Sequence, residues 1–200
     1  MSTQRRRLPP IVRMGQILDA ALQEFSASGY AGARMDDIAV RAGLSKGGLY
    51  AHFSSKEDVF QALLERHLCP PRLDAQAMVQ ASGTPRELAE CLVDHLYASL
   101  ANPAMIAMMR LLLAESARVP HLARRWWQET ADVHLEDIAR LLALARERGL
   151  CKAGVAARHP ELLLSPVVHA IVMAMLLGPE DSANLAARRD AHVALICGLL

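Results

Sequence analysis

Residues 36–53 of this 200-residue chain, DDIAVRAGLSKGGLYAHF, gather side chains that can hydrogen-bond to phosphate groups and to base edges. Lys46, Tyr50 and His52 bring an ammonium, a phenol and an imidazole close together in the sequence. Proteins use such donors to set their position on the backbone of DNA. The stretch therefore indicates DNA binding. The alternative is a short helical hairpin in an all-helical core, with a tyrosine that happens to be exposed.

Two short helices joined by a tight turn are expected to position these donors. Asp36 and Asp37 open the first helix, at the positive end of its dipole. Gly43 ends that helix, because glycine adopts the left-handed conformation of a turn at little steric cost. Ser45 is placed to cap the second helix by accepting a backbone N–H. This pattern is typical of a helix-turn-helix.

Two consecutive glycines, Gly47 and Gly48, lie in the first turn of the second helix. Each is about 1 kcal/mol less favourable than alanine inside a helix, so a purely structural helix would gain nothing from them. A helix whose amino-terminal end presses against a DNA backbone gains close approach. We therefore include both glycines in the predicted DNA surface.

With these residues in view, the chain resembles the tetracycline-repressor (TetR/AcrR) family of bacterial transcriptional regulators. The resemblance runs from Ile17 to Leu64, through ILDAALQEFSASGYAGA, the 36–53 stretch and SSKEDVFQALLE. It implies an all-α fold of about nine helices. It also implies a ligand-responsive regulator, most simply a repressor, that binds a near-palindromic operator in double-stranded DNA as a dimer and is released by a small-molecule inducer.

The resemblance also implies roles for individual residues. Lys46 is expected at a phosphate or a base edge, Tyr50 at a phosphate, and His52 at either. Lys56 is expected to bind phosphate at the start of the next helix. The full set of expected DNA-binding residues is Arg34, Ser45, Lys46, Gly47, Gly48, Tyr50, His52 and Lys56.

Two positions depart from the family pattern. Arg34 stands where the family usually has a Ser or Thr cap, and arginine cannot accept a backbone N–H, although its forked donors can reach a phosphate. Gly48 stands where the family more often has Thr, so one hydroxyl is absent. These departures favour an alternative function, a helical dimeric interaction protein with a degraded DNA reader.

The charge is distributed unevenly along the chain. Residues 1–56 hold eight lysines and arginines against four acids, whereas the whole chain has a net charge of +1. A basic module on a mildly acidic body predicts DNA contact at one end of the chain. We expect a flexible basic arm over residues 1–10, which either follows DNA or is a solvated tail. A helix-turn-helix domain over 11–55 and a helical ligand-binding and dimerisation domain over 56–200 are expected to follow.

Proline and glycine punctuate long helical patterns in the body, and no strand-like alternation occurs there. Alanine and leucine dominate the composition, which favours helix over strand. Besides the helix-turn-helix pair, helices are expected at about 11–26, 56–67, 85–100, 103–117, 120–149, 166–178 and 184–199.

Methionine and tryptophan side chains in the body could line an adaptable pocket for an apolar or amphipathic inducer. The alternative is that these side chains are core, as methionines at helical spacing usually are. The expected ligand-binding residues are His95, Met105, Met109, Glu115, Trp127, Thr130, His134 and Met173.

The last two helices are apolar on more than one side, which favours a homodimer seam of four helices, two from each chain. The alternative is a well-buried helix in a monomer. The apolar side chains that exceed one core face are Val167, Val168, Ile171, Val172, Met175, Leu176, Val193 and Leu200.

The motifs of common enzyme classes are absent from the sequence. It contains no His-Glu-x-x-His, no paired Cys-x-x-Cys, no Gly-x-Ser-x-Gly and no phosphate-binding glycine loop. We therefore expect no catalysis, no cofactor and no metal. The four scattered cysteines are expected to be reduced, with a redox sensor as the alternative.

No membrane partner is expected. The longest apolar run, 167–177, contains His169 and is too short to span a bilayer. The amino-terminal residues lack the apolar region of a signal peptide. These observations predict a soluble, cytoplasmic protein.

Overall fold

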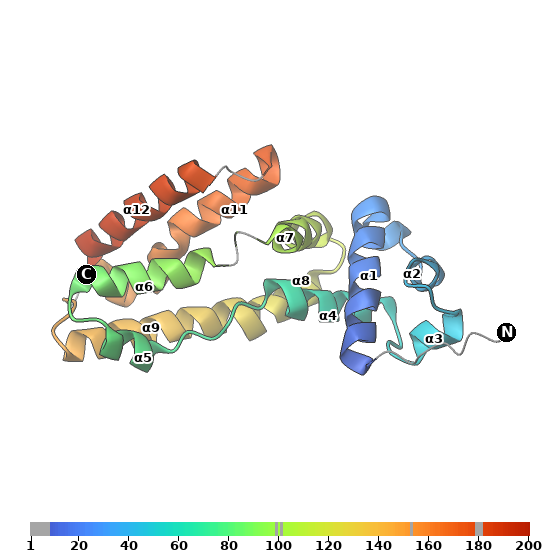
Figure 1. Cartoon of the computed structure of the whole chain (residues 1–200), viewed down its shortest axis with the longest axis horizontal. Coiled ribbons are helices and arrows are strands. Elements are labelled where there is room, and N and C mark those ends of the chain that lie inside the picture. Colours follow the sequence, from blue (N-terminus) through green and yellow to red (C-terminus); the bar gives the residue numbers. More distant parts are fainter. Residues whose placement is uncertain (1–8, 99, 101, 153, 179–181) are drawn as a thin grey trace. The chain divides into compact units, whose positions relative to one another are not determined.

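The computed structural model, shown in Figure 1, describes residues 9–98, 100, 102–152, 154–178 and 182–200. Across these residues the regular structure is helical and contains no strand, which confirms the all-α prediction. The chain divides into two compact units, Met1–Cys69 with Met108–Ala123, and Pro70–Ala107 with Arg124–Leu200. Most of the predicted basic arm, residues 1–8, lies outside the described residues.

The first unit consists of the amino-terminal helices and parts of two later ones. Its elements are α1 (Pro10–Gly32), α2 (Met35–Arg41), α3 (Lys46–Tyr50), α4 (Lys56–Leu68), the end of α7 (Pro103–Glu115) and the start of α8 (Pro120–Trp126). The unit thus includes α4, whereas the sequence analysis divides the chain after residue 55. The physical reason is burial, because Val59, Phe60, Leu63 and Leu64 of α4 are fully buried.

Aromatic rings form the centre of the first unit. Phe25 and Tyr30 of α1 lie 5.7 and 5.0 Å from the ring of Phe60 on α4, both edge-on. Burying such rings dominates the energetics of a small core. α1 runs past its predicted end at residue 26 and kinks at Gly29, whose φ of 67° is left-handed.

The second unit contains the long helices of the body. Its remaining elements are α5 (Ala75–Ala81), α6 (Pro85–Tyr97), η1 (Trp127–Ala131), α9 (Asp132–Glu147), α10 (Val155–Arg158), η2 (Pro160–Leu164), α11 (Ser165–Leu177) and α12 (Ser182–Leu199). α6 packs against α12, and α5 packs against α9. Leu88, Leu92, Ile138 and Leu141 lie in the core between these helices.

The predicted helices correspond to observed ones, with two additions in the described part of the chain. The short helices α5 and α10 were not expected from the sequence. The helix predicted over 120–149 is a continuous run of α8, η1 and α9, in which η1 is a π-helical turn. Capping explains two of the starts, because Ser55 with Asp58 and Thr84 with Glu87 each form a capping box.

The carboxy-terminal helices carry a large exposed apolar surface. Val168, Leu176 and Leu177 of α11 have exposed fractions of 51%, 73% and 78%. Two of the apolar residues predicted to lie in the dimer interface, Val167 and Val193, are instead buried in the core of the second unit.

By length and composition, Pro160–Leu177 could cross a membrane, although the sequence analysis found no such stretch. The difference arises because η2 and α11 join into one apolar helix.

Candidate nucleic-acid interface

The helix-turn-helix is formed by local hydrogen bonds between α2 and α3. Gly43 has a φ of 66°, and its N–H donates to the carbonyl of Val40 at 3.0 Å. The next N–H, of Leu44, donates to Ala39 at 2.8 Å, which closes the end of α2. Ser45 Oγ then accepts the N–H of Gly48 at 3.1 Å, so the predicted cap of the second helix is confirmed.

An ion pair and buried side chains attach this motif to α1. Arg41 of α2 donates two hydrogen bonds to Glu24 of α1, at 3.2 and 2.8 Å, and Ser28 donates a third at 2.8 Å. The hydrogen bond from Arg41, and then that from Ser28, lower the pKa of the nearly buried Glu24 carboxyl. Ile38 and Leu49 are fully buried beneath the turn. The orientation of α3 is therefore determined by its packing.

The polar side chains predicted to contact DNA are exposed on this motif. Arg34, Lys46 and His52 are exposed, and Tyr50 has an exposed fraction of 43%. Arg34 precedes α2 without capping it through its side chain, as its chemistry requires. Lys46 Nζ lies 3.1 Å from the carboxylate of Asp36, and this hydrogen bond raises the pKa of Lys46.

The two glycines have different surroundings. A Cβ added at Gly47 would meet no heavy atom within 4 Å, so this position is open. A Cβ at Gly48 would lie 3.2 Å from Ser45 Oγ and 3.7 Å from Leu44. The cap uses only the backbone N–H of Gly48 and does not require a glycine there, since the matching residues of the other two capped helices, Asp58 and Glu87, carry side chains.

The ammonium of Lys56 is occupied inside the protein. It donates to the backbone carbonyls of Tyr30, Ala31 and Ala33 at 2.6, 3.3 and 3.0 Å. It also lies 4.6 Å from the centre of the Tyr30 ring. Burial lowers its pKa. These three carbonyls use the three donors of an ammonium, so we assign Lys56 to holding the end of α1 against α4.

The residues predicted to bind a ligand are divided between the two units. Met109 and Glu115 belong to the first unit, where the carboxylate of Glu115 accepts the N–H of Tyr30 at 3.2 Å. In the second unit, Met105 is buried, Thr130 and Met173 are half-buried, and Trp127 is 52% exposed.

One predicted pair does come together in the second unit. The rings of His95 on α6 and His134 on α9 stack with centroids 5.6 Å apart and planes inclined by 16°. Burial is the main cause that lowers the pKa of each imidazole. Nε2 of His95 is buried and has no hydrogen-bond partner within the described chain. A polar ligand atom could supply that partner.

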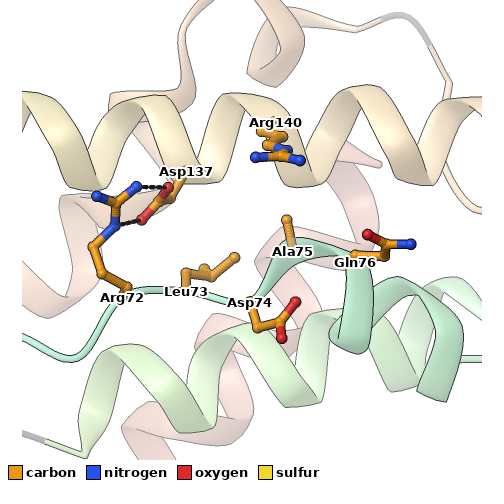
Figure 2. Close-up of a pocket in the computed structure, with 7 residues that line it drawn as sticks. All are labelled: Arg72, Leu73, Asp74, Ala75, Gln76, Asp137 and Arg140. Carbon is orange, nitrogen blue, oxygen red and sulfur yellow. Dashed lines mark hydrogen bonds and ion pairs between the residues drawn. The ribbon is translucent and has the colours of Figure 1, made fainter.

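A groove of about 320 Å³ lies beside α9, between it and the segment that leads into α5 (Figure 2). Arg72 spans it with two hydrogen bonds of 2.7 Å to Asp137, and these are the main cause that lowers the pKa of Asp137. None of the predicted ligand-binding residues lines this groove. Its lining residues are Arg72, Leu73, Asp74, Ala75, Gln76, Asp137 and Arg140. No sequence signal relates Arg72 to a partner so distant in the chain.

Comparison with known proteins agrees with this architecture. Residues 17–63 match the model of bacterial regulatory proteins of the tetR family. Residues 88–196, more than half of the chain, match the carboxy-terminal domain of AefR-like transcriptional repressors. The chain belongs to the TetR family. Members of this family are soluble DNA-binding regulators and are generally not enzymes.

Two relatives differ in how much of this TetR-family chain they match. The transcriptional repressor SCO4008 of Streptomyces coelicolor is 31% identical over 163 residues, covering 77% of this chain and 74% of that protein. The transcriptional activator FasR of Mycolicibacterium smegmatis is 53% identical over only 62 residues. That match spans 31% of this chain and 28% of FasR. Identity is therefore highest in the short FasR match.

Solved structures share the TetR-family fold over nearly the whole chain. A TetR-family regulator from Mesorhizobium loti has a TM-score of 0.77 at 24% identity and covers 96% of this chain and 98% of its own. SmeT, solved as a complex with triclosan, has a TM-score of 0.72 at 23% identity, covering 92% and 91%. At these identities the likeness concerns the fold.

Proposed function

We propose that this TetR-family chain is a cytoplasmic, ligand-responsive transcriptional repressor that binds a near-palindromic operator as a homodimer. The observation that carries the proposal is the row of exposed donors on the helix-turn-helix. Arg34, Lys46, Tyr50 and His52 are exposed there, while Ser45 is engaged as the cap of α3. Donors of this kind can bind phosphates and base edges when α3 enters a major groove.

The proposed contacts have two kinds of role. Arg34, Lys46, Tyr50 and His52 contact DNA directly, and Gly47 lets the backbone of α3 approach the groove. Ser45 and Gly48 form the cap that determines where these side chains point. Lys56 supports the same surface from behind through the carbonyls at the end of α1.

The proposed dimer forms through α11 and α12. Val168, Val172 and Leu176 recur every four residues along α11 and are all exposed, and Leu195 is an exposed apolar residue of α12. An exposed apolar stripe at helical spacing is stabilised when a second helix covers it. Two copies of the motif related by a two-fold axis would then contact paired half-sites.

The proposed inducer is a small apolar or amphipathic molecule bound in the second unit. The stacked His95 and His134 would provide its polar anchor, since Nε2 of His95 lacks a partner in the described structure. The triclosan complex of SmeT is a precedent for such a ligand on this fold. Triclosan is a suitable first probe. The proposal expects triclosan to raise the Tm of the wild-type chain, and to raise that of His134→Gln less. An unchanged Tm of the wild type would show that triclosan is not a ligand of this protein.

Selection of bound duplexes from a random pool, using the full chain at physiological salt, tests the DNA function. The proposal expects an enriched two-fold-symmetric motif. Val168→Glu with Leu176→Glu serves as the dimer control, and it should yield a monomer that loses the motif while remaining helical. No enrichment by a folded dimer would favour the alternative of a helical interaction protein with a degraded reader.

A further inference from the structure

An acidic side chain lies among the basic donors of the proposed DNA surface. Asp36, in the first turn of α2, places both carboxylate oxygens 3.1 Å from Nζ of Lys46, the first residue of α3. Both side chains are largely exposed, at 56% and 66%. The same ammonium lies 6.0 Å from the centre of the Tyr50 ring. Lys46 is thus restrained between a carboxylate and an aromatic ring.

This ion pair has little to do with holding the fold together. Exposed pairs of this kind contribute little to stability, since water competes for both charges and two side chains must be ordered. A carboxylate beside the proposed phosphate-binding groups also repels DNA. The favourable placement of an acid at the start of α2 is already provided by Asp37 in the same turn. The consequence of the pair must therefore be sought in DNA binding.

We infer that Asp36 is a positioning residue that helps the protein discriminate its operator from random DNA. It holds the ammonium of Lys46, so that this charge contributes less to binding random DNA. The inference rests on the proposed DNA-binding function. Random DNA is bound through phosphates, and each lysine that reaches one releases counterions. While Lys46 remains paired with Asp36, its charge is neutralised in such complexes. In the operator complex α3 sits at a defined depth in the groove, and Lys46 is presented beside Tyr50 to one acceptor.

The chain offers a matched control for this inference. Asp37 is the next residue of α2, is exposed, and makes no side-chain ion pair or hydrogen bond in the described structure. Asp36→Asn and Asp37→Asn remove the same charge from the same helical turn. Only the first frees Lys46. The difference between the two variants therefore separates release of Lys46 from a general change in charge.

The experiment measures the affinity of the full chain, over a series of salt concentrations, for the selected operator and for a random duplex of equal length. Asp36→Asn should bind random DNA about fivefold more tightly than Asp37→Asn does, with a salt slope steeper by about one per subunit. Operator affinity should change by about twofold or less. Discrimination should therefore fall about fivefold in Asp36→Asn alone.

A further variant tests whether the effect passes through Lys46. In a Lys46→Gln background, Asp36→Asn and Asp37→Asn should behave alike, because no ammonium remains to be released. Equal effects of the two substitutions on the wild-type chain would overturn the inference while leaving DNA binding intact. Failure of the wild-type chain to bind any duplex would instead overturn the proposed function. Equal Tm values for the variants exclude unfolding as the cause.

Discussion

In the first unit the polar side chains proposed for binding lie exposed on short helices, whereas in the second unit His95, His134 and Asp137 lie half-buried or buried between long ones. Exposed donors such as Lys46 and Tyr50 can meet a large, flat polyanion without rearrangement of the core. Buried groups can meet only a small ligand that enters the protein. The two units thus differ in polar accessibility, and this difference supports the proposal that DNA binds the first unit and a small ligand the second.

Both units combine satisfied and unpaired buried polar groups. Glu24 in the first unit receives hydrogen bonds from Arg41 and Ser28. Nε2 of His67 in the first unit, and Nε2 of His95 and Nδ1 of His192 in the second, are buried with no partner in the described chain. An unpaired buried polar atom is costly, so each of these atoms lowers the stability of its own unit.

The largest effect is expected from the aromatic core of the first unit. Phe60→Ala should lower the free energy of unfolding by about 3–5 kcal/mol, because it removes a fully buried ring that contacts Phe25 and Tyr30. Urea unfolding can be followed separately in the second unit, since Trp126 and Trp127 both belong to it. The tryptophan transition should shift less than the loss of helical circular dichroism. Coincident shifts would show that the two units unfold as one.

Lys56→Met tests whether Lys56 stabilises the first unit or binds DNA. It keeps the aliphatic stem but leaves the carbonyls of Tyr30, Ala31 and Ala33 without their donor. Stability should fall by about 1–3 kcal/mol, with the salt slope of DNA binding unchanged. Unchanged stability, together with a salt slope of DNA binding lowered by about one per subunit, would show instead that Lys56 contacts a phosphate.

Tyr50→Phe tests the exposed surface without disturbing the core. The variant should bind operator and random DNA about fivefold more weakly per subunit, as expected for a lost hydrogen bond of about 1 kcal/mol to a phosphate from each chain. Its Tm should not change, because the Tyr50 hydroxyl has no partner in the described protein. Unchanged affinity would show that the Tyr50 hydroxyl does not contact DNA. A loss of affinity for the operator alone would show that it contacts a base and not a phosphate.

The smallest expected effect is a loss of stability in acid. Burial lowers the pKa of His95, His134 and His192 in the second unit below their ordinary value of 6.5. Their unfolded forms bind protons first as the pH falls, so the stability that these groups contribute is complete above 6.5 and declines below it. Tryptophan-monitored unfolding over this range should show the decline.

His134→Gln is the matched variant for this pH dependence, since it keeps a polar side chain beside His95 but cannot titrate. Its unfolding free energy should vary less with pH below 6.5 than that of the wild type. An identical pH profile would place the titration elsewhere, for example at His67, whose pKa burial also lowers in the first unit.

The sequence could predict the helix-turn-helix in detail because its structure depends on neighbouring residues. Gly43 adopts the left-handed turn and Ser45 caps α3, both within a few residues of the groups that they serve. The predicted ligand-binding residues had no such local structure to support them. Its residues were chosen by type and helical spacing, and the structure brings together only His95 and His134 among the pairs whose contact it describes.

By itself, the sequence determined the all-helical fold, the turn between α2 and α3, and the family to which the chain belongs, since helix periodicity, caps and turn glycines act over short distances in the chain. Only the tertiary structure decided that Lys56 binds the end of α1, that Glu115 accepts the N–H of Tyr30, and that Arg72 pairs with Asp137. These partners lie 26, 85 and 65 residues apart. A long charged side chain can reach many acceptors, and packing of distant helices selects which one it meets.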